Sequence, residues 1–205
     1  MIRIAFTKGR IEAKAIEIFE KAGYNCEELK NKGRKLFFSI GEDIEVVLAK
    51  ANDVITYVEH GVCDMGIVGK DTIMENGSGF YEMLDLGFGK CRFALAAKKS
   101  SDFFGGYAHK TVASKYPKVA KDYFSSLGMD VEIVKIDGSV ELAPLLGLAD
   151  GIVDIVETGS TLKENGLEIV SDVAPISARL IVNAASIKLK KDKIDKIISD
   201  IERQI

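Results

Sequence analysis

The stretch 150-DGIVDIVETGSTL-162 decides the fold of this chain. Ile152, Val153, Ile155 and Val156 form a nearly continuous apolar run, which is typical of a parallel strand covered on both faces. A glycine among hydroxyl residues follows, and then a short helical pattern that ends at another glycine. The stretch therefore predicts a buried strand, a tight turn and a short helix that is started by a Ser or Thr cap and stopped by glycine.

Two acids in this stretch raise a chemical question. The start of the helix would present free backbone N–H groups, which suit a phosphate, but Asp154 and Glu157 would repel a bare phosphate. Asp154 also interrupts the apolar strand, where a charge is costly to bury. A phosphorylated sugar resolves the conflict, because the N–H groups can hold its phosphate while a carboxylate accepts hydrogen bonds from ribose hydroxyls. A capped strand–turn–helix is common, so the bare pattern leaves a purely structural role open.

Strand and helix patterns alternate outward from this stretch. Strands are predicted at residues 2–6, 35–40, 44–50, 64–69, 91–97, 131–136, 168–174 and 178–186. Helices are predicted after residue 10, at 51–61 with Asn52 or Asp53 as cap, at 117–127, at about 139–148, and at the C-terminal end. Such alternation implies an α/β protein with mainly parallel sheets.

The chain has two plausible crossing points between lobes, near residues 87–91 and 174–179. If it leaves a first domain at one point and returns at the other, two lobes form with a cleft between them. We expect residues 1–88 plus 178–205 in the first lobe and residues 89–177 in the second. The periodicity alone leaves a single doubly wound sheet as an equal alternative.

Composition excludes several kinds of protein. The 47% hydrophobic fraction is ample for a packed core, and the net charge of −3 argues against a nucleic-acid binder. The start resembles no signal peptide, and no apolar run approaches the roughly 18 residues that span a bilayer. Cys26, Cys63 and Cys91 are scattered, which favours reduced thiols in a cytoplasmic protein, with Cys91 buried and inert.

Familiar catalytic motifs are also missing. The two histidines have no metal-ligand partner at useful spacing, which argues against a zinc site or a Ser-His-Asp triad. The sequence contains neither a GxSxG elbow nor a phosphate-binding GxxxxGK[ST] loop. What remains is a set of loops at the carboxyl ends of strands, where open α/β sheets bind ligands.

Three of these loops carry charge or glycine. Lys8 and Arg10 stand at a predicted helix N-terminus, where the helix dipole is already positive and two further cations are unfavourable. A bound polyphosphate would offset this repulsion; the alternative is that both are solvated surface cations. Asp71 follows a short strand and would serve equally well as a helix cap. The stretch 87-GFGKCR-92 permits either close backbone approach to a ligand or an interdomain hinge.

Together these stretches resemble the ATP phosphoribosyltransferase family over essentially the whole chain. The family signature is a glutamate and a glycine with five residues between them, then I/V-x-D, then T-G-x-T-L; it is matched here by Glu141, Gly147, Ile152, Asp154, Thr158, Gly159, Thr161 and Leu162. Further family blocks are TKGRI, YVEHGVCDMGIVGKD, DLGFGKCRFALA and ASKYP. The family usually has an arginine where Lys50 stands, so a bidentate phosphate contact becomes a point-charge contact here.

The resemblance implies a fold and a reaction. The fold is two α/β lobes like a periplasmic solute-binding protein of type II, with the active site in the cleft. The reaction is displacement of diphosphate from phosphoribosyl diphosphate by N1 of the ATP adenine, with Mg²⁺, as the first step of histidine biosynthesis. The first lobe would meet ATP and polyphosphate, and the second would bind phosphoribosyl diphosphate.

The resemblance also implies site residues. The predicted catalytic residues are Lys8, Arg34 and Lys50. The predicted substrate-binding residues are Arg10, Asp71, Glu141, Asp154, Glu157, Thr158, Gly159, Ser160, Thr161 and Leu162. Among these, the three acids Asp154, Glu157 and Glu141 would hold the ribose hydroxyls or the metal bound to them.

Partners follow from the same resemblance. The chain looks like the short form of the family, which works with a separate regulatory subunit resembling histidyl-tRNA synthetase (HisZ-type), so we expect a homodimer within a hetero-oligomer. The C-terminal stretch places Ile194, Ile197, Ile198, Ile201 and Ile205 on one helical face, which either meets a partner or packs on the first lobe. A solute-binding receptor of the same fold, without catalysis, is the alternative function.

Overall fold

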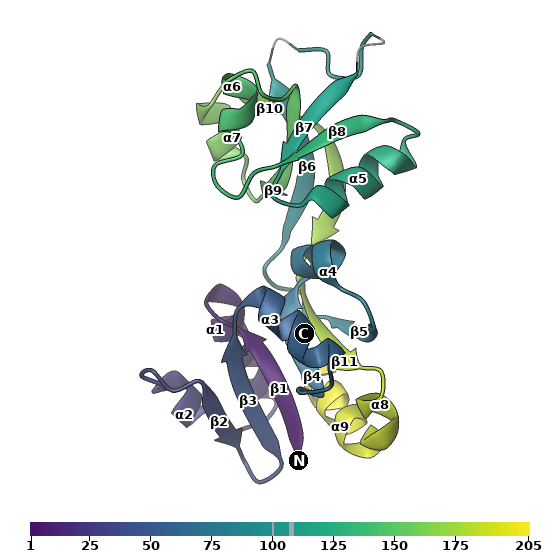
Figure 1. Cartoon of the computed structure of the whole chain (residues 1–205). Helices are drawn as coiled ribbons and strands as arrows, with labels where there is room; N and C mark the ends of the chain where they lie inside the picture. Colours follow the sequence, from purple (N-terminus) through teal and green to yellow (C-terminus); the bar gives the residue numbers. More distant parts are fainter. Residues whose placement is uncertain (100, 107–108) are drawn as a thin grey trace. The chain divides into compact units, whose positions relative to one another are not determined.

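The computed structural model describes residues 1–99, 101–106 and 109–205. The chain forms two compact units, one from Met1–Gly89 with Ser177–Ile205 and one from Lys90–Ile176 (Figure 1). Each unit is built on a single β-sheet with helices packed against it, so the protein belongs to the α/β class.

The first unit contains a six-stranded sheet of order β2-β3-β1-β4-β11-β5. Its elements are β1 (Ile2–Thr7), α1 (Arg10–Lys21), α2 (Glu27–Lys30), β2 (Phe37–Ile40), β3 (Ile44–Ala49), α3 (Ala51–Glu59), β4 (Met65–Gly69), α4 (Lys70–Asn76), β5 (Phe80–Asp85), β11 (Ala178–Asn183), α8 (Ser186–Leu189) and α9 (Lys191–Glu202).

Helices cover both faces of this sheet because successive strand residues point to opposite sides. Ile4 and Phe6 of β1 pack with α1 and α9 in one core cluster, whereas Ala5, between them, packs with α3 in another. Most of the predicted isoleucine stripe belongs to the first cluster: Ile194, Ile197 and Ile201 are buried and Ile198 packs against them half-buried, whereas Ile205 lies beyond α9 and is exposed. The stripe therefore packs on the first unit's own sheet.

The second unit contains a five-stranded sheet of order β10-β6-β9-β7-β8. Its elements are β6 (Cys91–Lys98), β7 (Lys110–Ser114), α5 (Pro117–Ser126), β8 (Val131–Lys135), α6 (Leu142–Leu145), β9 (Gly151–Val156), α7 (Ser160–Glu164) and β10 (Leu167–Ile176).

Strand β9 lies in the middle of the second sheet and has both faces covered. Ile152 and Val156 pack with α6 and α7. Residues of the other parity face the opposite side, where Phe103 covers Gly151 so closely that a Cβ there would lie 2.9 Å from its ring. Asp154 has the same parity as Ile152, so it lies on the face that α6 and α7 cover.

The expectation of mainly parallel sheets is wrong in detail. In the first sheet only β1–β3 and β1–β4 pair in parallel, and in the second only β7–β8 and β7–β9 do. Strand β9 has a parallel neighbour on one side and the antiparallel β6 on the other. An apolar run reports burial on two faces, not strand direction, so the sequence pattern could not distinguish these pairings.

Two predicted elements end earlier than expected. The helix expected at 139–148 is reduced to α6, because Pro144 lacks a backbone donor and Gly147 has a positive φ of 76°. The strand expected at 178–186 ends at Asn183. There the Asn183 side chain accepts hydrogen bonds from the N–H groups of Ala185 and Ser186, both at 2.9 Å, which turns the chain into α8.

The three cysteines are free thiols. Burial raises the pKa of Cys26 and of Cys63 to about 11, so both are unreactive at neutral pH. Cys91 is only half-buried, because it stands at the first position of β6, where cover is incomplete; its expected full burial is wrong. Within the described residues, no helix has the length and apolar character needed to cross a membrane.

Candidate active site

The β9–α7 turn has the backbone geometry of an anion site. Strand β9 ends at Val156, and α7 begins at Ser160 with Gly159 as its N-cap in the left-handed region (φ 80°). The expected Ser or Thr cap is therefore wrong: only glycine adopts this conformation without strain. Thr158, Ser160 and Thr161 are exposed. The first N–H groups of a helix have no acceptor within it, so this turn presents donors and hydroxyls on one short loop.

Packing holds the turn in place from below. Leu162 is buried at 6% exposure in the same cluster as Ile152 and Val156. Its side chain anchors α7 to the sheet, so any contribution of Leu162 to ligand binding must come from its backbone. At the exposed side, the Thr158 hydroxyl lies 3.1 Å from the Ser160 hydroxyl, and either can donate to an incoming oxyanion.

Asp154 in β9 and Glu141 before α6 are two acids that interact electrostatically. The pKa of Asp154 is raised above its usual value, chiefly by burial and also by the charge of Glu141. A hydrogen bond from the Ile155 N–H and the charge of Lys115 offset part of this increase. Glu141 stands at the cap position of α6 and is half-buried. An acid whose charged form is disfavoured by burial beside a second acid is a candidate for a functional site.

Lys115 is a residue that the sequence prediction did not assign. It directly follows β7, which pairs in parallel with β9 through Ser114 and Val153. The Ser114 hydroxyl donates to the Val153 carbonyl at 2.6 Å and accepts from the Tyr116 N–H at 2.9 Å. This fixes the peptide of Lys115 next to Ser114, which lies opposite Val153 in the middle of β9. The block ASKYP contained the signal, but only the strand order shows that it adjoins Asp154.

Loops of the first unit gather at one edge of its sheet. Strands β3, β1 and β4 are parallel neighbours, so the residues that follow them, Lys50, Lys8 and Lys70, emerge at the same edge. The Lys8 N–H donates to the Ala49 carbonyl at 2.9 Å, and the Thr7 hydroxyl donates to the Ile67 carbonyl at 2.8 Å. The structure thus brings the loop 7–10 and Lys50 together, as expected for loops at the carboxyl ends of parallel strands.

Arg34 approaches the same edge from a different direction. It precedes β2, which runs antiparallel to β3, and the Leu48 N–H donates to the Leu36 carbonyl at 2.9 Å. In the described part of the chain, the side chains of Lys8, Arg34 and Lys50 are exposed and form no ion pair or hydrogen bond. These cations are available to a ligand.

Asp71 does not cap a helix. The N-cap of α4 is Gly69, and Asp71 is the second helical residue. Its carboxylate folds back over Gly69 so closely that a Cβ there would lie 2.1 Å from Asp71 Oδ1. The cap expected for α3 at Asn52 or Asp53 is also wrong, because that helix begins directly after β3 with Lys50 as its cap.

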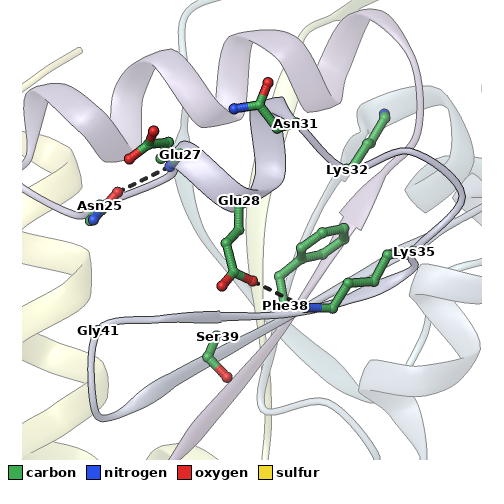
Figure 2. A pocket seen from close by; sticks show the side chains of 9 residues that line it. All are labelled: Asn25, Glu27, Glu28, Asn31, Lys32, Lys35, Phe38, Ser39 and Gly41. Carbon is green, nitrogen blue, oxygen red and sulfur yellow. Dashed lines mark hydrogen bonds and ion pairs between the residues drawn. The ribbon is translucent and has the colours of Figure 1, made fainter.

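A hollow in the first unit lies beside the segment that carries Arg34. It measures about 640 Å³ and is lined by Asn25, Glu27, Glu28, Asn31, Lys32, Lys35, Phe38, Ser39 and Gly41. Figure 2 shows Glu28 paired with Lys35, at 3.0 Å, and the Lys35 Nζ lies 5.1 Å from the centre of the Phe38 ring. The Glu28 and Lys35 side chains pair with one another, and none of the predicted site residues is among the described residues that line the hollow.

The side chains that could ligate a metal are sparse in the part of the chain that the structure describes. The described residues contain no group of three or more His, Cys, Asp or Glu side chains that could hold a metal ion. Mg²⁺ usually binds through one or two carboxylates plus substrate phosphates and water. Asp154 and Glu141 are two carboxylates close enough to interact, since the charge of Glu141 helps to raise the pKa of Asp154.

Comparisons with known proteins define first the class and then the family. The periplasmic aliphatic sulphonate binding protein SsuA from Escherichia coli superposes with a TM-score of 0.60 over 99% of this chain and 72% of its own, at 10% identity. That likeness shows the fold alone: a two-unit α/β protein of the periplasmic-binding-protein kind.

The family follows from much closer relatives. The family model described as HisG: ATP phosphoribosyltransferase matches residues 50–203. ATP phosphoribosyltransferase of Clostridium kluyveri is 63% identical over all of this chain and 94% of its own length, and that of Clostridium botulinum is 58% identical, covering 98% of its length. The ATP phosphoribosyl transferase (HisG:HisZ) complex of Thermotoga maritima contains a chain with a TM-score of 0.83 and 34% identity, covering 99% of this chain and 98% of that one. This chain belongs to the ATP phosphoribosyltransferase family.

Proposed function

We propose that this chain transfers the phosphoribosyl group of phosphoribosyl diphosphate to N1 of ATP and releases diphosphate, the first step of histidine biosynthesis. The observation that carries the proposal is the similarity to ATP phosphoribosyltransferases over the full chain. The β9–α7 turn beside Asp154 supports it, because it combines phosphate donors with a carboxylate suited to ribose.

The second unit would bind phosphoribosyl diphosphate. The N–H groups of the turn 157–162 would hold its 5-phosphate, assisted by the hydroxyls of Thr158, Ser160 and Thr161. Asp154, with Glu141 and Glu157, would accept hydrogen bonds from the ribose hydroxyls. This assignment answers why a carboxylate stands beside a phosphate site: hydroxyls need acceptors where the phosphate needs donors.

The first unit would bind the polyphosphates. Lys8, Arg34 and Lys50 are exposed cations at one edge of the sheet, and Arg10 begins α1 beside them. Asp71, in the first turn of α4 after β4, would face the same edge and accept hydrogen bonds from the nucleotide. Lys8, Arg34 and Lys50 would stabilise the charge that develops on departing diphosphate, which is why we place them in the catalytic role.

Asp154 and Glu141 would hold Mg²⁺ together with the substrate's own oxygens. When bound, the ion neutralises diphosphate and makes it a better leaving group. The metal arrangement is proposed from the chemistry of these two acids.

The chemistry requires alignment more than side-chain catalysis. Adenine N1 carries a lone pair and no proton that must leave before attack. The N1–C1 bond forms as the bond from C1 to the diphosphate oxygen breaks, and the electron pair leaves with diphosphate. Holding the two anionic substrates in line supplies most of the acceleration.

The direct test is a two-substrate assay. The purified chain, with and without a HisZ-type subunit, is supplied with ATP, phosphoribosyl diphosphate and Mg²⁺, and the N1-ribosylated nucleotide is identified by mass. Product that requires both substrates supports the proposal. Complete absence of product in the presence of the partner would refute it.

We further propose a cytoplasmic homodimer that assembles with a HisZ-type regulatory subunit. The relevant chain of the Thermotoga maritima structure comes from a HisG:HisZ complex and matches this one along nearly its whole length. Because the isoleucine face of α9 is buried in the first unit, the subunit would bind elsewhere. Co-expression followed by size measurement tests the assembly, and histidine inhibition only in the mixture would assign feedback to the partner.

A further inference from the structure

We infer that Glu12 is a positioning residue that orders the two basic segments of the first unit, the loop 7–10 and the segment carrying Arg34. The inference rests on the proposed function, since it concerns how the polyphosphate-binding cations are held. Glu12 lies in the first turn of α1 and is only 4% exposed.

Each oxygen of the Glu12 carboxylate contacts a different basic segment. Oε2 accepts a hydrogen bond from the Gly9 N–H at 3.3 Å. Oε1 pairs with Nζ of Lys32, two residues before Arg34. One buried side chain therefore joins the peptide between Lys8 and Arg10 to the neighbouring basic segment.

The loop needs such a contact because its conformation is unusual. Gly9 has φ 100° and ψ −135°, a region open essentially only to glycine. Glycine is free to leave that region as well, so it does not by itself hold the loop in one shape. A charge-assisted hydrogen bond from the Gly9 N–H to a buried carboxylate does.

The charges are also balanced for anion binding. An unpaired buried carboxylate beside Lys8 and Arg10 would repel a polyphosphate. The ion pair with Lys32 makes this support electrically neutral, and the positive end of α1 further favours an acid in its first turn. A hollow of about 460 Å³ runs along α1; Gly9, Glu12 and Lys32 line it at the loop end, and Glu20 and Lys30 line it further along the helix.

The chain offers a matched control on the same helix. Glu20 also lies in α1 and pairs with Lys30 at 2.6 Å, so it ties α1 to the same following segment without contacting the loop. Glu12→Gln keeps the side-chain size and an acceptor for Gly9 but removes the charge that Lys32 meets. Glu20→Gln makes the same chemical change at the far end of the helix.

The experiment measures both kinetics and loop order in the full assembly with its regulatory partner. Glu12→Gln should raise KM for ATP about tenfold or more, as expected for loss of one charge-assisted hydrogen bond, with a smaller change in kcat. Amide exchange of residues 7–10 should accelerate. Lys32→Met should act in the same direction, and the double variant should be no worse than the worse single one. Glu20→Gln should change neither measurement.

Two outcomes would overturn the inference. If Glu12→Gln matches Glu20→Gln in KM, or if it loses thermal stability while residues 7–10 exchange at the wild-type rate, Glu12 is only a structural acid. Failure of the proposed function would be visible separately, because the unsubstituted protein would then form no product, while the exchange comparison would still decide whether Glu12 orders the loop.

Discussion

The conformation of Gly159 permits a sharp test that separates phosphate binding from stability. Gly159 has φ 80°, and an added Cβ would lie 3.7 Å from Val156 Cγ1 and 3.8 Å from Ile169 Cδ1, which are ordinary contacts. Alanine therefore fits sterically, and its cost is backbone strain of about 1–2 kcal/mol. At the low end, about 1 kcal/mol lowers the melting temperature of a unit of this size by roughly 4–8 °C.

Gly166 supplies the matched control. It ends the same helix, has φ 70° and meets nothing within 4 Å of an added Cβ. Gly166→Ala should therefore cost about as much stability as Gly159→Ala, as measured by thermal denaturation of the two variants side by side.

Only Gly159→Ala should affect the sugar substrate. Relief of strain at position 159 would turn the N–H groups that open α7 away from the phosphate. Loss of one charge-assisted hydrogen bond is worth about 1.5–3 kcal/mol, so KM for phosphoribosyl diphosphate should rise roughly 10- to 100-fold. Steady-state kinetics at saturating ATP measures it. An unchanged KM in folded Gly159→Ala, or an equal rise in Gly166→Ala, would refute the phosphate assignment.

Three further predictions concern charged side chains. Asp154→Asn should abolish turnover yet stabilise the second unit at neutral pH, because burial raises the pKa of Asp154 and its charged form therefore opposes folding. This gain in stability should vanish as the pH falls below the usual carboxyl range, where Asp154 is protonated in the folded and unfolded states alike. Loss of folding in Asp154→Asn would instead favour a structural role. Asp64 behaves oppositely: burial works to raise its pKa, but hydrogen bonds from Lys190, the Arg3 N–H and the Ser186 hydroxyl outweigh it and hold the pKa below its usual value. The charged Asp64 carboxylate therefore stabilises the fold at pH values above its pKa in the unfolded chain, and this contribution is lost as the pH falls. Asp64→Asn should lower the free energy of unfolding by about 2 kcal/mol at neutral pH and make that free energy depend less on pH in the acid range. An unaltered dependence of stability on pH would contradict this. Lys50→Arg should maintain or raise kcat/KM, because a guanidinium can grip phosphate with two bonds; a tenfold fall would show that Lys50 does not meet phosphate.

Local patterns predicted most elements because each depends on short-range properties. Apolar runs marked β1, β4 and β9, and the spacing of Ile194, Ile197 and Ile201 marked α9. Helix caps were predicted less well: Gly159, Gly69 and Lys50 start helices that the pattern assigned to Ser, Thr, Asp or Asn. Which residue caps a helix depends on the direction in which the chain leaves the preceding strand, and the sheet sets that direction.

Much of the candidate site could be named from the sequence, since a signature such as Glu141, Asp154 and T-G-x-T-L combines residue types with fixed spacing. The missed residues have in common that their relevance depends on strand order. Lys115 matters because β7 adjoins β9, and Glu12 matters because its two oxygens reach segments on either side of it in the chain. The roles of all these residues stay predictions until they are tested.

The sequence by itself determined the α/β class, the burial of the central strands and the chemistry available at their ends, because periodicity and residue type are local properties. The tertiary structure alone decided the direction of each strand pair, the burial of most of the α9 face within the first unit, and which charges interact: Asp64 pairs with Lys190, and the charges of Glu141 and Lys115 act on Asp154. All three features depend on contacts between residues far apart in the chain. The free energy of such contacts depends on how the whole sheet is assembled, which a local pattern does not contain.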